Sequence, residues 1–88
     1  MEKTTVMLSG YKITPMQAKC LSLLLVSHTA KQIAIILDRP PRTIEKHMEN
    51  IRRNLNLHNK KQILQLIMDS NEFDALISIA QELLYNKP

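Results

Sequence analysis

Apolar residues recur through most of this chain at intervals of three and four positions, the spacing that places side chains on one face of an α-helix. The polar stretch before Ile13 lacks this pattern, so residues 1–12 are expected to form a flexible N-terminal segment. Thr14 followed by Pro15 offers an N-cap and a residue suited to the first helical turn. The apolar positions that follow predict a first helix over residues 15–26.

A capping-box pattern marks the start of a second helix. Thr29 is followed three positions later by Gln32 and then by an apolar run, which predicts a helix over residues 30–37. The next four residues, 38–41, read Asp-Arg-Pro-Pro and cannot continue a helix, because two consecutive prolines remove two amide donors. A turn is therefore expected there, and Pro41 can serve as the first residue of a third helix.

The third helix is expected to run from Pro41 to about Leu55, with two faces of opposite character. Steps of four, three and four residues place one apolar row on its buried side: Ile44, Met48, Ile51 and Leu55. Polar side chains fall on the other side: Arg42, Glu45, Lys46, Glu49 and Arg53. A short helix, a turn and a second helix with a basic outer face form a helix-turn-helix, whose second helix can enter the major groove of DNA. A polar helix face is also common as a solvated surface, so the pattern by itself leaves both interpretations open.

Two more helices follow in the pattern. Asn56 can end the third helix in left-handed geometry, and Asn59 with Gln62 suggests another capping box that starts a fourth helix running to about residue 69. After the capping residues Ser70 and Asn71, apolar positions at helical spacing predict a fifth helix to about residue 85. The chain holds a single Gly and three aromatic residues, little material for hairpins or a sheet core. The expected fold class is therefore all-α, a small helical bundle.

Charged side chains are distributed unevenly along the chain. The formal net charge is +4. Residues 39–65 carry seven basic side chains against two acidic ones, whereas residues 66–88 carry four acidic side chains against one basic one. Because a binding surface needs its charge gathered in one place, the basic middle of the chain is the candidate contact region for an acidic partner such as nucleic acid.

Several stretches of this sequence fall in the order and spacing of a known family: Ile13-Thr14-Pro15, Lys31-Gln32-Ile33-Ala34, Pro41-Arg42-Thr43-Ile44-Glu45-Lys46-His47, Ile51 and Leu55. Together they resemble the LuxR-type (LuxR/FixJ/GerE-like) helix-turn-helix DNA-binding domain. The resemblance implies a bacterial-type transcriptional regulator that binds duplex DNA as a dimer. It also divides the chain into a flexible segment (1–12), the DNA-binding domain (13–69, a four-helix core) and an additional C-terminal helix (70–88).

The sequence departs from the pattern of that family at several turns. Ser27 or His28 stands where a Gly usually precedes the second helix, Asp38 replaces the Gly of the turn, and Pro40 replaces the usual Ser cap. Glu45 and Glu49 occupy the surface expected to face the groove, where relatives often carry basic or neutral side chains. Two interpretations of these carboxylates are open. Either their repulsion from the phosphates weakens DNA binding, or a carboxylate accepts a hydrogen bond from the amino group of cytosine.

Candidate DNA contacts follow from the exposed side of the third helix and from helix N-termini. The candidates for contacts to base edges are Arg42, Glu45, Lys46, Glu49 and Asn50. The candidates for contacts to phosphates are Thr29, Lys31, Thr43, Arg53, Lys60 and Lys61. The competing interpretation for both sets is a solvated, solubilising surface. His47 matches a characteristic family position at the edge of the buried face, where a structural hydrogen bond is the expected role.

The last two helices carry more apolar residues than one core can cover. The candidates for a homodimer contact are Leu64, Met68, Phe73, Leu76, Ile77, Ala80, Leu83 and Leu84. An acidic fifth helix that exchanges apolar contacts with a second copy would strengthen a symmetric dimer. The alternative is that this helix packs on its own chain.

Other chemistry finds little support in the residues. The single cysteine, Cys20, lies in an apolar run and is expected to pack as a small hydrophobe. No metal-ligand spacing, no activated nucleophile and no cofactor motif is recognisable, so neither an enzyme nor a cofactor is expected. The absence of a signal-peptide pattern or a long apolar stretch predicts a cytoplasmic protein without a membrane partner.

Two rival functions remain open from the sequence. The first is a helical protein-interaction module, in which the apolar tail binds another regulator or an RNA polymerase subunit. The second is a detached promoter-recognition domain resembling region four of a sigma factor, against which the Pro-Arg-Thr-Ile-x-x-His pattern argues. Whether the chain is complete or the output half of a larger sensor is also undecided, as are the operator and the sign of regulation.

Overall fold

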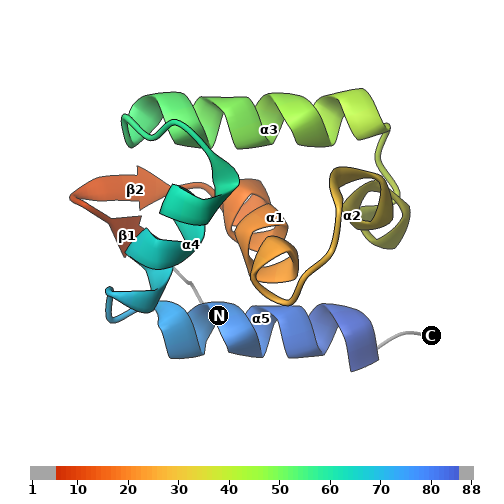
Figure 1. The fold of residues 1–88 in the computed structure, drawn as a ribbon. Helices are drawn as coiled ribbons and strands as arrows, with labels where there is room; N and C mark the ends of the chain where they lie inside the picture. The colour runs from red at the N-terminus through yellow and green to blue at the C-terminus, as the bar shows by residue number, and fades with distance from the viewer. Residues whose placement is uncertain (1–5, 86–88) are drawn as a thin grey trace.

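The computed structural model describes residues 6–85 as a short hairpin followed by five helices (Figure 1). The elements in chain order are β1 (Val6–Leu8), β2 (Tyr11–Ile13), α1 (Pro15–Leu25), α2 (Ala30–Leu37), α3 (Pro41–Asn54), α4 (Lys60–Met68) and α5 (Phe73–Tyr85). All five predicted helices are present, each ending within one residue of its expected limit. The helical fold class and the helix-turn-helix formed by α2 and α3 are therefore confirmed.

The prediction of a flexible N-terminal segment is wrong for residues 6–12. They form the antiparallel hairpin β1–β2, in which Val6 pairs with Ile13 and Leu8 pairs with Tyr11. The side chains of Val6, Leu8 and Ile13 are buried, so the hairpin contributes to the core instead of fraying. Residues 1–5 of the same segment lie outside the described residues.

The turn of this hairpin explains how a chain with one glycine forms it. Ser9 and Gly10 both have positive φ, 50° and 83°, as the type I′ two-residue hairpin turn requires. Gly10 adopts such a φ without steric cost, and the chain places its only glycine at this position. The local sequence signal was the turn dipeptide Ser9-Gly10 between two short segments with apolar residues, Val6-Met7-Leu8 and Tyr11-Lys12-Ile13.

Helix α1 is the centre of the fold. In Figure 1 it lies between α3 and α5, and its most extensive contacts are with these two helices. Four consecutive residues, Cys20 to Leu23, are fully buried, so the helix is covered on all sides. The hydroxyl of Ser22 donates to the carbonyl of Lys19 at 2.8 Å, which satisfies the polar atom inside this apolar setting.

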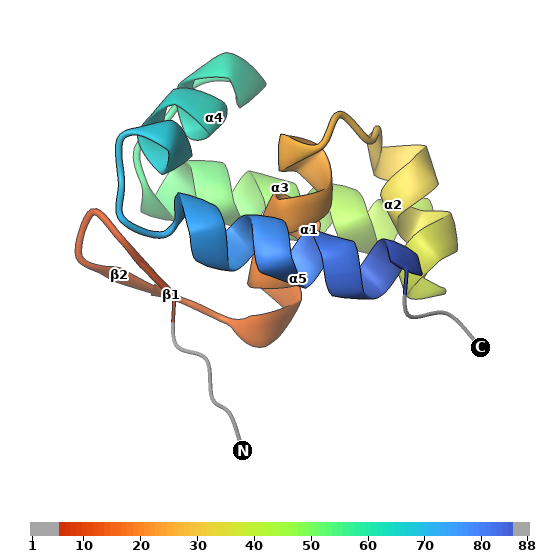
Figure 2. The ribbon, with the colours of Figure 1, turned by 90° about the horizontal axis from the view of Figure 1, so that it is seen from below.

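Helix α5 is part of the same core. Seen from below, it crosses in front of α1 (Figure 2), and its residues Leu76 and Ala80 are 0% exposed. The turn before α5 also reaches the hairpin, because a carboxylate oxygen of Glu72 accepts from the backbone N–H of Met7 at 3.4 Å. The structure therefore favours the alternative that α5 packs on its own chain.

Side-chain caps fix where the helices begin. Thr14 and Thr29 both form reciprocal capping boxes. The hydroxyl oxygen of each threonine accepts from the backbone N–H of the glutamine three residues later, and the side-chain oxygen of that glutamine accepts from the backbone N–H of the threonine. The predicted third box is only half correct. The side chain of Asn59 accepts from the N–H of Gln62, but the amide oxygen of Gln62 accepts from the N–H of His58 at 2.6 Å.

Three non-glycine residues adopt left-handed geometry at the helix ends. Ser27, Asp38 and Asn56 have φ values of 71°, 57° and 57°. Ser27, one of the two positions at which the resemblance puts a glycine before the second helix, and Asp38, at the turn position, both adopt the left-handed conformation that glycine takes most easily. After Asp38, the N–H of Arg39 donates to the carbonyl of Ala34 at 2.9 Å and closes the turn that leads into α3.

Candidate nucleic-acid interface

Helix α3 presents one face to the core and the opposite face to solvent. Ile44 and Ile51 are 0% exposed, and Met48 is half-buried, as the apolar row predicted. The outer face forms a shallow hollow lined by Arg42, Glu45, Lys46, Glu49, Asn50 and Arg53. The structure thus brings all five base-edge candidates together, with one phosphate candidate at their C-terminal end.

The charge of this outer face is mixed instead of uniformly basic. Three cationic and two anionic side chains alternate along it, which leaves a small positive excess. Arg53 and Glu49 form an ion pair with 3.1 Å between a guanidinium nitrogen and a carboxylate oxygen, and both side chains are more than half exposed. Glu45 is exposed, and among residues 6–85 no ion pair includes it. The two glutamates therefore differ in environment although they lie one turn apart.

The phosphate candidates lie on several elements around α3. Thr29 and Lys60, at the N-termini of α2 and α4, line one hollow together with Arg52 and His58. Helix N-termini carry unpaired N–H groups and a partial positive charge, which suit anion contacts. Lys31 and Lys61 are exposed, whereas Thr43 is half-buried in the first turn of α3.

Sequence reasoning missed Arg52 as part of this surface. Its guanidinium donates to the carbonyl of His58 at 3.5 Å, which ties the end of α3 to the loop before α4. The signal was present, because Arg52 belongs to the basic stretch 39–65, but its half-buried position between the two faces of α3 gave it no clear assignment. The hollow between α2 and α4 identifies it as a neighbour of Thr29 and Lys60.

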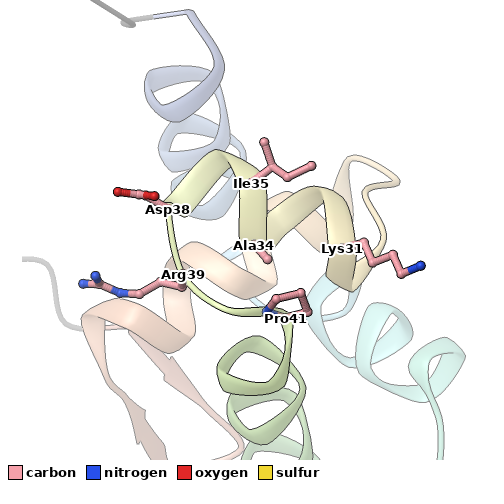
Figure 3. Close-up of a pocket in the computed structure, with 6 residues that line it drawn as sticks. All are labelled: Lys31, Ala34, Ile35, Asp38, Arg39 and Pro41. Carbon is pink, nitrogen blue, oxygen red and sulfur yellow. The ribbon is translucent and has the colours of Figure 1, made fainter.

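A third hollow lies at the corner of the helix-turn-helix, away from the outer face of α3. It is lined by Lys31, Ala34, Ile35, Asp38, Arg39 and Pro41. Figure 3 shows Lys31 and Arg39 pointing outward on opposite sides, with Ala34 and Pro41 between them. Ile35 is 79% exposed, the most exposed of the large aliphatic side chains in residues 6–85. This hollow combines apolar side chains with two cations, Lys31 and Arg39, and one carboxylate, Asp38.

The arrangement of these elements agrees with a comparison to known protein families. A family profile described as "Bacterial regulatory proteins, luxR family" matches residues 12–67. This span is more than half of the chain and includes α1 to α3 and most of α4. The chain belongs to the luxR family. No curated protein and no solved structure gives a significant match.

Membership of the luxR family identifies the helix-turn-helix as a DNA-binding element. This luxR-family chain carries the DNA-binding domain of a transcription regulator, with α2 and α3 as its helix-turn-helix. The family match ends at Ile67 and begins at Lys12, so strand β1 and helix α5 lie outside it. Strand β1 is linked to the turn before α5 by the hydrogen bond from Met7 to Glu72, and α5 packs on the side of α1 that faces away from α3 (Figure 1).

The dimer candidates of this luxR-family domain fall into three groups by burial. Leu76 and Ala80 were expected to contact a second copy, but they are 0% exposed within one chain, so that expectation is wrong for them. They face α1 because a five-helix chain of this size needs them to close its core. Ile77, Leu83 and Leu84 on α5 and Leu64 on α4 are half-buried. Met68 at 60% and Phe73 at 36% are the exposed members.

Other reactive groups of the luxR-family domain lie apart from the interface. Burial raises the pKa of the Cys20 thiol to about 11, so this thiol stays protonated in the folded protein near neutral pH. His47 is half-buried, and none of the hydrogen bonds found among residues 6–85 includes its ring. Within the same residues no three His, Cys, Asp or Glu side chains are grouped to hold a metal ion, and no helix has the length and apolarity of a membrane span.

Proposed function

We propose that this luxR-family domain regulates transcription by inserting α3 into the major groove of duplex DNA. The observation that carries the proposal is the outer face of α3, where six polar or charged side chains, from Arg42 to Arg53, gather on a helix whose opposite face is buried. An α-helix fits the width of the major groove, and Arg, Lys, Asn and Glu are side chains that read base edges there. Such a function places the domain in the cytoplasm, beside bacterial DNA.

The flanking elements supply contacts to phosphates. The N-termini of α2 and α4 line a hollow of their own beside α3, with Thr29 on one helix and Lys60 on the other. Contacts of this kind fix the register of a protein on the duplex without reading its sequence. The same role extends to four further phosphate candidates: Lys31, Thr43, Arg53 and Lys61. Arg53 either leaves Glu49 to contact a phosphate or contacts both groups at once.

We also infer that the domain binds as a homodimer through α4 and the turn after it. Met68 and Phe73 are exposed apolar side chains close together in the sequence, and Leu64 lies one turn before Met68 on the same helix. An isologous contact would bury this row against its copy and present two α3 helices to two half-sites. Helix α5 then contributes through Phe73 at its start, while most of its apolar face remains on α1.

Fluorescence anisotropy with pooled random duplex DNA across a salt series tests the DNA-binding function. Binding should weaken steeply as salt rises, because each cation that neutralises a phosphate releases a counterion. Lys46→Glu should abolish most of this binding with the circular-dichroism spectrum unchanged. Lys12→Glu is the matched control, since it makes the same charge change on the hairpin. Equal binding by both variants would remove the outer face of α3 from the interface.

Sedimentation equilibrium tests the dimer separately. Met68→Glu introduces a charge at the exposed end of α4 and should weaken self-association by tenfold or more, while its monomer remains folded. Tyr85→Glu, on a similarly exposed side chain at the end of α5, should leave association unchanged. A wild-type chain that sediments as a monomer at 100 μM and binds single half-sites would reject the dimer.

The corner hollow favours a second candidate function, contact with another regulator or an RNA polymerase subunit. The exposed Ile35, flanked by Lys31 and Arg39, suits a partner segment that offers an apolar side chain between carboxylates. Ile35→Glu should abolish association with purified RNA polymerase on a shared duplex and leave the affinity for DNA alone unchanged. Normal association of that variant would reject RNA polymerase as the partner of this hollow.

A further inference from the structure

The outer face of α3 carries two glutamates, and its charge alone does not explain what they do on DNA. A carboxylate brought near the phosphates of DNA is repelled and loses water, which weakens binding unless it finds a donor. Glu45 and Glu49 lie one helical turn apart and line the same hollow. We propose that Glu45 reads cytosine and thereby directs this domain to G·C base pairs, an inference that rests on the proposed function.

Glu49 already has a partner within its own helix. One of its carboxylate oxygens lies 3.1 Å from a guanidinium nitrogen of Arg53, four residues further along α3. The pair offsets the negative charge of Glu49, and the remaining guanidinium N–H groups point to Arg53 as a donor to phosphate. Glu49 therefore affects DNA binding mainly through its charge, which lowers the electrostatic potential of the outer face of α3.

Glu45 has no such partner among the described residues. It is exposed near the N-terminal end of α3, between the cationic side chains of Arg42 and Lys46 in the sequence. An ionised carboxylate only accepts hydrogen bonds, so it needs a donor from the DNA. In the major groove the donors are the amino groups of cytosine and adenine.

The identity of the neighbouring base atoms favours cytosine over adenine. The adenine amino group lies beside N7 of the same base, an acceptor that repels a carboxylate, whereas cytosine carries no acceptor on its own major-groove edge. Lys46, next to Glu45, supplies the complementary donor for O6 and N7 of guanine. Side by side, an acceptor and a donor of opposite charge match the two bases of G·C pairs.

Binding-site selection from random duplexes, followed by anisotropy titrations, tests this inference. The selected half-site should contain a cytosine whose replacement weakens binding by about 5- to 150-fold, the range for one good base contact. Glu45→Gln should remove that discrimination or shift it to adenine, because an amide pairs with the adenine amino group and N7. Glu49→Gln removes the same charge from the same face, and Glu82→Gln removes it from α5. Both controls should keep the cytosine preference.

The outcomes separate this inference from the proposed function. If Glu45→Gln changes the affinity for every sequence by one factor, as Glu49→Gln is expected to do, the carboxylate acts only through its charge and the inference is overturned while DNA binding stands. A cytosine preference that follows Glu49 instead of Glu45 overturns it as well. Failure of the wild-type chain to bind DNA at low salt overturns the proposed function and the inference together.

Discussion

Helix α5 lies outside the family match. The substitution Leu76→Ala in this helix tests whether α5 belongs to the core of the domain. Leu76 is 0% exposed, and α5 is the most extensive partner of α1. Replacing a fully buried leucine by alanine removes apolar contacts and leaves a cavity, at a cost of about 3 kcal/mol within a range of about 2–5 kcal/mol. A domain of 88 residues is stable by only about 4–13 kcal/mol in total, so the loss is large.

Thermal and urea unfolding, followed by circular dichroism, measure this loss. For a domain of this size about 3 kcal/mol corresponds to a decrease of roughly 12–24 °C in Tm. The matched control is Tyr85→Ala at the other end of α5, where the side chain is 81% exposed and the expected change is within about 0.5 kcal/mol. The loss for Leu76→Ala should not depend on protein concentration, because the contacts lie within one chain.

Two results would contradict the assignment of α5 to the core. A loss below about 1 kcal/mol would mean that Leu76 is not buried as the structure has it. A loss that shrinks as the protein is diluted would mean that the contacts form between chains, because the wild type also gives them up when it dissociates, and the original expectation of α5 as a dimer element would return.

Three further substitutions or conditions have defined outcomes. Thr29→Ala removes the capping box of α2 and should lower the free energy of unfolding by about 1 kcal/mol in urea titrations; no change would show that the cap is not formed in solution. Asp38→Gly relieves a left-handed φ of 57° and should raise the urea midpoint by an equivalent of about 0.5 kcal/mol; a lower midpoint would mean that the side chain itself stabilises the turn. Between pH 9 and 11 the unfolded Cys20 thiol ionises while the folded one, with its pKa raised to about 11, stays protonated, so stability should fall by about 1 kcal/mol at pH 10 relative to Cys20→Ala. Parallel losses in both proteins would refute the burial effect.

The outer face of α3 was predictable residue by residue because its signals are local. A helix of 14 residues turns at a fixed rate, so the apolar steps from Ile44 to Ile51 fix which side chains must lie opposite. The family motif adds the functional meaning of that face. The different environments of Glu45 and Glu49 were not predictable, because an exposed side chain has several rotamers and only the folded arrangement shows which of them meets Arg53.

The sequence by itself determined where the five helices begin and end, since capping residues such as Thr14 and Thr29 and the two prolines at the start of α3 act within a few residues of the backbone. It also determined the family. Only the tertiary structure decided that residues 6–13 form a hairpin and that Leu76 and Ala80 of α5 cover α1. An apolar row states that a face will be buried, but its partner is chosen by the packing of the whole chain, and short strands gain stability only from the core they cover.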